Sequence, residues 1–257
     1  GELFSFNLQL QNHRRIVSRL QLLIRSKAAT KRYLARCLYT VGFGNNDYIN
    51  NYLEPQFYGT SRIYTPRQFA GILIRHYSRQ LRRLYLLGAR KVAVYGLGSL
   101  GCIPAELFTN GTCVDSINNE VQLFNDNLMP LVDLLNVKLR DAQFIYVNVT
   151  AINSSNSSTP AEITIGNAPC CNVSVSVADG QCMPGQVPCS NRNQYYFWDD
   201  FHPTEIVNQA FSRSAYVALS PLLDAYPFAI DSPAELNSRA ENPCLQYNLQ
   251  WLVPTFQ

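Results

Sequence analysis

Apolar side chains recur with a helical period in four stretches of the chain, which predicts four amphipathic helices. These stretches are residues 10–25, 66–87, 115–139 and 203–219. Thr65 is suited to cap the second helix at its N-terminus, and Gly88 stands where a left-handed residue ends a helix. Asp115 and Ser116 are the candidate caps of the third helix.

Three short runs rich in apolar, β-branched and aromatic residues alternate with these helices and predict buried strands at residues 37–44, 91–95 and 143–149. Strands that alternate with helices indicate an α/β fold with a parallel sheet. Residues 151–193 are rich in Ser, Gly, Pro and Cys, which predicts a long loop held by disulfides. No repeat or linker divides the chain, so we expect residues 1–257 to form a single domain.

The composition is that of a globular protein, because 47% of the 257 residues are hydrophobic and only 15% are charged. The net charge is +3. Arginines cluster at residues 14–25 and 75–90, but both clusters lie within amphipathic helical patterns, which favours solvated helix faces over a nucleic-acid site. No apolar run approaches the roughly 18 residues that span a bilayer, and residue 1 does not begin a signal peptide.

Cysteines and glycosylation sequons indicate the compartment. There are eight cysteines, an even number that is typical of disulfide-bonded proteins. Five Asn-x-Ser/Thr sequons occur, at Asn110, Asn148, Asn153, Asn156 and Asn172. Together they predict a glycoprotein of the secretory pathway, either secreted to the extracellular space or delivered to the vacuole. A zinc site is disfavoured, since no Cys-x-x-Cys pair exists, and we expect no bound metal.

A glycine run, Gly96-Leu-Gly98-Ser-Leu-Gly101, follows the second predicted strand and matches the dinucleotide-binding fingerprint. That site requires a helix whose N-terminus faces the pyrophosphate, and here Cys102-Ile-Pro104 follows, which leaves room only for a very short helix. Ser99 does not fit a nucleophile elbow either, because Leu97 occupies its first glycine position. The run therefore does not predict a nucleotide site.

Two other segments contain residues suited to catalysis. His202 follows Asp199 by three residues just before the fourth predicted helix, so the carboxylate can fold back onto one imidazole nitrogen and leave the other free as a general base. Gly44, Asn46 and Asp47 lie at the end of the first predicted strand, where an Asn side chain can donate to an oxyanion. Taken alone, either segment is more consistent with an ordinary polar loop than with a catalytic site.

Together, however, the segments resemble a known family. Residues 41–52, which contain Gly44-Asn-Asn46-Asp47, resemble the Gly-x-Asn-Asp block of the SGNH hydrolases, in the form typical of plant GDSL esterase/lipases. Residues 197–205 resemble their Asp-x-x-His block, and Gly101-Cys102-Ile-Pro resembles a segment of the plant members. The cysteines of residues 170–189 also follow the plant pattern, and the resemblance extends over roughly residues 1–231.

The resemblance implies a three-layer α/β/α sandwich and an esterase without metal or cofactor. In this family pattern His202 is the general base and Asp199 orients it. Asn46 donates to the oxyanion, Gly44 shapes the loop that presents it, and Asp47 holds that loop by hydrogen bonds. The substrate would be a small-molecule or lipid ester.

The sequence also departs from the family. The Gly-Asp-Ser block with the nucleophile does not occur in these residues. We expect the serine, the first strand and the first helix on a segment N-terminal to residue 1, present as part of the same chain or as a bound fragment; a true truncation without the serine is the less favoured alternative. Residues 232–257 form a C-terminal extension. Cys244 in that extension needs a partner, for which Cys37 is a candidate, whereas Cys102 and Cys113 are close enough to pair with each other. The remaining disulfide candidates are Cys170, Cys171, Cys182 and Cys189.

Two further interpretations of the function stay open. A catalytically silent secreted glycoprotein of the same fold could bind an ester, a glycan or a protein. An acyltransferase could use the same triad with an alcohol in place of water, since only acceptor binding and exclusion of water distinguish it from a hydrolase.

Overall fold

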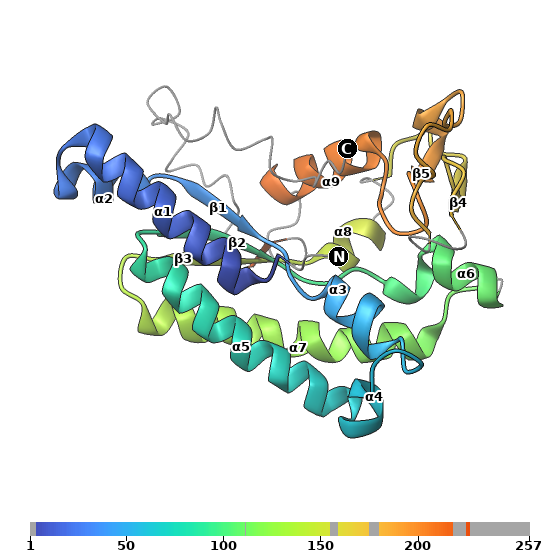
Figure 1. Ribbon diagram of the computed structural model, residues 1–257, viewed down its shortest axis with the longest axis horizontal. Helices are drawn as coiled ribbons and strands as arrows, with labels where there is room; N and C mark the ends of the chain where they lie inside the picture. The colour runs from blue at the N-terminus through green and yellow to red at the C-terminus, as the bar shows by residue number, and fades with distance from the viewer. Residues whose placement is uncertain (1–3, 111, 155–158, 175–179, 218–224, 227–257) are drawn as a thin grey trace.

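The computed structural model describes residues 4–110, 112–154, 159–174, 180–217 and 225–226 (Figure 1). The α-helices are α1 (Phe6–Ile24), α2 (Lys27–Ala35), α3 (Asn45–Asp47), α4 (Thr60–Ile63), α5 (Pro66–Leu86), α6 (Pro104–Asn110), α7 (Asp115–Lys138), α8 (Val149–Ser154) and α9 (Glu205–Val217). Short π and 3-10 turns are η1 (Tyr48–Tyr52), η2 (Leu100–Cys102) and η3 (Arg192–Gln194). The strands are β1 (Leu38–Val41), β2 (Lys91–Tyr95), β3 (Gln143–Val147), β4 (Ile165–Pro169), β5 (Tyr195–Phe197) and β6 (Ala225–Tyr226).

The three predicted strands form a parallel sheet in the order β1-β2-β3, and β6 adds to β3 in the antiparallel sense. Val94 of the central strand aligns with Val41 on one side and with Tyr146 on the other. Parallel strands need crossover connections, and α5 and α7 provide them. The predicted α/β fold with a parallel sheet is therefore confirmed.

Helices cover both faces of this sheet, as the alternation of side chains along β2 shows. Val92 and Val94 belong to the larger core cluster, which also contains buried residues of α1, α5 and α7. Ala93 belongs to a second cluster with Ile152 of α8 and Ala215 of α9. Figure 1 shows the same arrangement, with α5 and α7 below the sheet and α9 above it. The three-layer α/β/α sandwich follows, because successive strand residues point to opposite faces.

Local sequence signals mark both ends of α5 but not the start of α7. Thr65 and Gln68 form a capping box at the start of α5, and Gly88 beyond its end has a φ of +113°. The predicted cap of α7 is wrong: Val114 occupies the N-cap without a side-chain hydrogen bond, and Asp115 lies in the first turn. There Asp115 can still stabilise the helix, because a carboxylate near the N-terminus opposes the helix dipole.

The region predicted as one long loop, residues 151–193, contains regular structure. It includes most of α8 and all of β4, and β4 pairs with β5 in a separate two-stranded sheet. Ile165 aligns with Tyr195 and Pro169 with Phe197, with an irregular register between them. Such a short, irregular strand lacks the alternation from which strands are predicted. The C-terminal extension, residues 232–257, lies outside the described residues.

Candidate active site

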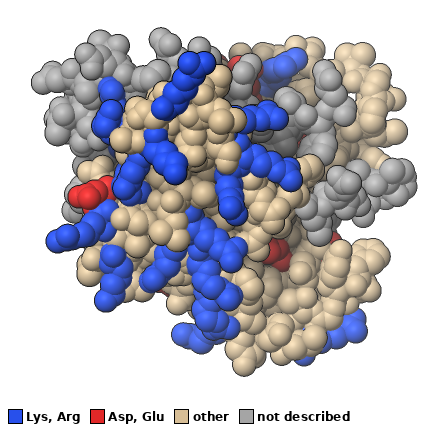
Figure 2. All heavy atoms as spheres, turned by 60° about the vertical axis from the view of Figure 1, so that its left-hand side comes forward, with Lys and Arg blue, Asp and Glu red and all other residues tan. Residues whose placement is uncertain are grey.

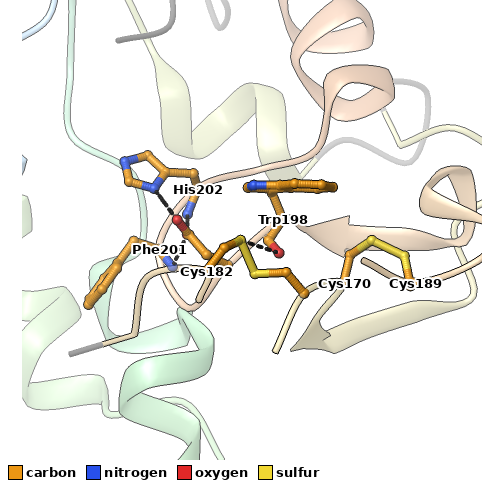
Figure 3. The surroundings of a disulfide bond; sticks show 8 residues. Cys170, Cys182, Cys189, Trp198, Phe201 and His202 are labelled. Carbon is orange, nitrogen blue, oxygen red and sulfur yellow. Dashed lines mark hydrogen bonds and ion pairs between the residues drawn. A yellow bond between two sulfur atoms is a disulfide. The ribbon is translucent and has the colours of Figure 1, made fainter. Parts of the chain in front are cut away.

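Asp199 and His202 lie in a tight loop between β5 and α9. Phe197 and Pro203 form an antiparallel bridge across this loop, and the Trp198 N–H donates to the His202 carbonyl at 2.7 Å. Closing the loop in this way brings the two side chains together, as Figure 3 shows. The sequence spacing of three residues therefore produces the contact that it predicted.

The Asp199 carboxylate accepts hydrogen bonds on both oxygens. Its Oδ2 lies 2.8 Å and its Oδ1 3.0 Å from Nδ1 of His202. Oδ1 also accepts the backbone N–H groups of Phe201 at 2.9 Å and His202 at 2.7 Å. Because the carboxylate is acceptor-only, Nδ1 carries the proton, and Nε2 is the nitrogen available to a substrate or a nucleophile.

Burial and charge differ between the two partners. The side chain of Asp199 is 8% exposed and that of His202 is 60% exposed. Burial by itself raises the pKa of the Asp199 carboxyl, but the hydrogen bonds from His202 and Phe201 outweigh it and hold that pKa below its ordinary value. The hydrogen bond to Asp199 raises the pKa of His202, against a smaller opposing effect of burial. The pair therefore stabilises an imidazolium with one nitrogen open to solvent.

Disulfides and backbone hydrogen bonds hold the loop in place. The predicted cysteines pair as Cys170–Cys189 and Cys171–Cys182, and Figure 3 shows both bonds beside Trp198. The N–H groups of Cys170 and Cys171 both lie 3.1 Å from the Trp198 carbonyl oxygen. The disulfide-bonded segment is thus attached to the residue that precedes Asp199.

Gly180 and Asp200 complete this support, and sequence analysis did not single out either residue. The Asp200 N–H donates to the Gly180 carbonyl at 2.9 Å. Gly180 has a φ of +83°, and a Cβ there would lie 2.6 Å from the Phe201 ring and 2.8 Å from Cβ of Asp200. Only glycine fits such a position without strain. In the sequence, the only indication that Gly180 has a structural role is its position within a cysteine-rich segment.

The Gly44-Asn46 segment follows β1 directly. Gly44 has a φ of +127° and precedes α3, and a Cβ there would lie 2.9 Å from Leu97. Asn46 is exposed on α3, and its side chain makes no hydrogen bond to any described residue. Asp47 is also exposed, and the hydrogen bonds expected to hold the loop are not found between its carboxyl and other described residues.

Both candidate segments lie at the carboxyl end of the parallel sheet and both contact the chain that leaves β2. Gly44 packs against Leu97 in that connection, and the Ala105 N–H donates to the Asp200 carbonyl at 3.3 Å. In Figure 1, α3, α6 and β5 accordingly lie at the same end of the sheet. No hydrogen bond joins Asn46 to His202 within the part of the chain that is described. Ligands of parallel α/β sheets bind at this end.

The glycine run after β2 is fixed by close packing. The buried Asn125 of α7 accepts the Leu97 N–H at 2.8 Å and donates to the Leu97 carbonyl at 2.9 Å. A Cβ on Gly96 would lie 2.8 Å from the Tyr146 hydroxyl, and one on Gly101 would lie 2.2 Å from the Val114 carbonyl oxygen. Close approach of backbone and side chains therefore accounts for these glycines.

The other predicted residues are placed as follows. Cys102 pairs with Cys113 as expected; Cys37 is also disulfide-bonded, and Cys244 lies outside the described residues. Among the sequons, Asn153 and Asn172 are exposed, whereas Asn148 is half-buried and accepts the Ala151 N–H. Asn156 and the side chain of Asn110 lie outside the described residues.

His13 and His76 are the other two histidines of the chain; burial raises the pKa of the Asp47 carboxyl, and the nearby His76 opposes that effect. His76 is exposed on α5, in agreement with a helix surface position. His13 is half-buried against Tyr39, with ring centroids 5.5 Å apart, and burial lowers its pKa. Over the described ranges, no group of three or more His, Cys, Asp or Glu residues is arranged to hold a metal ion. Within the same ranges no helix is both long and apolar enough to cross a membrane.

Comparisons with known proteins identify the family. Residues 5–214 match the family described as GDSL-like lipase/acylhydrolase. GDSL esterase/lipase At1g29670 of Arabidopsis thaliana is 44% identical over 241 residues, which cover 92% of this chain and 66% of that protein. GDSL esterase/lipase At1g29660, from the same plant, is 39% identical over 242 residues, again 92% of this chain and 66% of the relative. The chain thus spans about two thirds of the length of these relatives, and it belongs to the GDSL-like lipase/acylhydrolase family.

Proposed function

We propose that these residues form the acid–base and oxyanion part of a serine ester hydrolase whose nucleophile lies on a preceding segment. The geometry of the Asp199–His202 pair is the observation that carries this proposal: Nδ1 is held at 2.8 and 3.0 Å while the side chain remains 60% exposed. A general base needs one oriented nitrogen and one free nitrogen, and this pair has both.

In the proposed reaction, Nε2 of His202 removes the proton from a serine hydroxyl as the oxygen attacks the ester carbonyl. Asn46 donates an N–H to the resulting oxyanion. Collapse of the tetrahedral intermediate transfers the proton from His202 to the leaving alcohol and forms an acyl-enzyme. His202 then deprotonates a water molecule as its oxygen attacks the acyl carbonyl, and it returns the proton to the serine oxygen as the acyl–serine bond breaks, which releases the carboxylic acid and restores the serine.

The supporting arguments are the family membership and the chemistry of Asp199, His202 and Asn46 in this chain. The relatives are named esterase/lipases, which supports carboxylic esters as substrates. Three disulfides among the described residues support passage through the secretory pathway, with Asn153 and Asn172 as exposed glycan acceptors. A shift in mass after endoglycosidase treatment of the purified protein tests the glycan assignment.

The catalytic proposal is tested by hydrolysis of p-nitrophenyl butyrate by the protein purified with its complete N-terminal segment. We expect Asn46→Ala to lower kcat by about 10²- to 10³-fold with little change in KM, because the oxyanion exists only in the transition state. Asn45→Ala is the matched control, since this neighbouring asparagine is also exposed on α3 and should retain wild-type kcat.

His202→Gln should abolish turnover to within the background rate, with His76→Gln as its control. A wild-type rate in His202→Gln would overturn the proposed role. Intact mass and N-terminal sequencing of the active protein then test the location of the serine. Activity in a preparation that contains residues 1–257 alone would contradict a nucleophile on a preceding segment.

A further inference from the structure

The basic residues of this chain are concentrated on three helices. Fifteen of its 21 Lys and Arg residues lie within residues 6–36 and 66–91, and none of its 18 Asp and Glu residues lies there. These two segments contain α1, α2 and α5. Because the net charge is only +3, the rest of the chain is acidic, and the charge of the protein is strongly asymmetric.

The exposed cations of these helices form one surface, which we call the basic face. Its members are Arg14, Arg15, Arg19, Arg25, Lys27, Lys31, Arg32, Arg67, Arg75, Arg79, Arg82 and Arg83. Figure 2 shows Lys and Arg side chains spread across this side of the molecule, with few acidic side chains in view. Asn7 of α1 joins the helices, since its Oδ1 accepts from Arg83 at 3.3 Å and from Gln80 at 3.5 Å.

The arrangement of these cations is unfavourable for the isolated protein. Arg75, Arg79 and Arg83 follow one another at intervals of four residues along α5, as Arg15 and Arg19 do on α1. Like charges at this spacing are neighbours on a helix surface and repel each other. No member of the basic face forms an ion pair with a carboxylate in the described part of the chain. An external anionic surface would relieve this repulsion.

Two of the helices that carry these cations, α1 and α5, also carry exposed apolar side chains. Leu22 is 77% exposed and Leu23 is 78% exposed near the end of α1, and Leu86 is 79% exposed at the end of α5. Leucines beside Lys and Arg are typical of helices that lie on a lipid interface, where the apolar groups insert between headgroups. A soluble polyanion such as an acidic polysaccharide or a nucleic acid would pair with the arginines but gain nothing from these leucines.

We propose that the basic face docks on an anionic lipid surface. The docking requires α1, α2 and α5 and is independent of the proposed catalysis, so either proposal can fail alone. Lys and Arg residues attract the negative headgroups over about one Debye length, and the exposed leucines supply a contact that salt does not screen.

Co-sedimentation of the whole protein with vesicles tests this proposal. We expect binding to phosphatidylcholine vesicles that contain about 30% phosphatidylserine and little binding to phosphatidylcholine alone. Binding should weaken as the salt concentration rises from about 0.1 M to about 1 M, because the Debye length falls from about 10 Å to about 3 Å. Equal binding to both kinds of vesicle would overturn the proposal.

Charge-reversal variants locate the surface. Arg19→Glu combined with Arg82→Glu changes one exposed cation on each of two helices and should weaken vesicle binding at least about tenfold. Neither guanidinium makes a side-chain hydrogen bond to a described residue. Arg62→Glu combined with Arg213→Glu makes the same change of charge on α4 and α9 and should alter binding less than about twofold. Wild-type binding by the first variant, with thermal unfolding unchanged, would refute the assignment.

A third variant distinguishes a lipid surface from a soluble polyanion. Leu22→Gln combined with Leu23→Gln preserves every charge, so we expect weaker vesicle binding but unchanged retention of the protein on polygalacturonate or heparin. If this variant binds vesicles as wild type does, and the wild type binds the soluble polyanion more tightly than vesicles, the partner is a polyanion and the lipid proposal is wrong.

Discussion

Replacing Asp199 by asparagine tests the role of the carboxylate in the proposed base. Oδ1 of Asp199 accepts two backbone N–H groups, at 2.7 and 2.9 Å. The carbonyl oxygen of an asparagine will therefore keep this position, and its NH₂ group will take the place of Oδ2, 2.8 Å from Nδ1 of His202. A donor at this shorter contact favours an Nδ1 that accepts, although the retained Oδ1 lies 3.0 Å from Nδ1, so we expect the proton to move to Nε2 and the base to be lost.

The expected loss of kcat is about 10⁴-fold, the loss found when a triad histidine is held in the wrong tautomer. The cost in stability is smaller, about 1–2 kcal/mol, since two charge-assisted hydrogen bonds to backbone N–H become neutral while a buried charge is removed. The rate is measured with p-nitrophenyl butyrate on the protein with its N-terminal segment, and the tautomer by ¹⁵N NMR of His202.

Asp200→Asn is the matched control. Asp199 and Asp200 are each 6% exposed, but the Asp200 carboxyl does not contact His202. This substitution should change kcat less than about threefold, because the tautomer of His202 does not depend on Asp200. If Asp199→Asn kept wild-type kcat, or if Nε2 remained unprotonated in that variant, the argument from hydrogen-bond geometry would be refuted.

Three other outcomes follow from the described contacts. The hydrogen bond to Asp199 raises the pKa of His202, so kcat/KM should rise with pH through a value above 6.5. The raised pKa also contributes stability to the folded protein that is present below pH 6.5 and lost as the pH increases. His202→Gln should therefore lower the melting temperature more at about pH 5 than at about pH 9. Gly180→Ala should lower the free energy of unfolding by about 2–4 kcal/mol in denaturant titrations, since the added Cβ would clash with Phe201 and Asp200. Gly185→Ala is the control: Gly185 has a φ of +77° but open space around it, so this change should cost only about 1–2 kcal/mol. Equal losses would contradict the steric argument. Asn125→Ala leaves the buried N–H of Leu97 unpaired, while the Leu97 C=O still accepts the Thr150 hydroxyl at 3.2 Å, and should cost about 1–3 kcal/mol by thermal unfolding, with a loss below about 0.5 kcal/mol as the contrary result.

The pattern of apolar residues along the chain was sufficient for the main elements of the fold. Period and caps predicted α1, α5, α7 and α9 and the three parallel strands, because burial of an amphipathic face leaves a repeated signal in the sequence. The elements that were missed, such as α2, α8 and β4, are short or lack that periodicity. Their conformation depends on contacts with other parts of the chain, which no local pattern records.

In the candidate site, too, some contacts could be predicted from the sequence and others could not. The Asp199–His202 contact was predictable, because three residues of separation and one tight loop bring the two side chains together. Likewise the spacing of Cys102 and Cys113 indicated their disulfide. These contacts are local, so the sequence by itself determines them.

Only the tertiary structure decided what lies around those residues. Gly180 is required because Phe201 occupies the space of its missing Cβ, and Asn125 reaches Leu97 across 28 positions of the chain. The basic face likewise arises because α1 packs against α5, with Phe6 against Tyr77 in the core and Asn7 bonded to Arg83 at the surface, so that cations from distant segments share one side of the molecule. A sequence states which side chains exist, but close packing between distant segments decides which of them meet, because that packing depends on the whole fold.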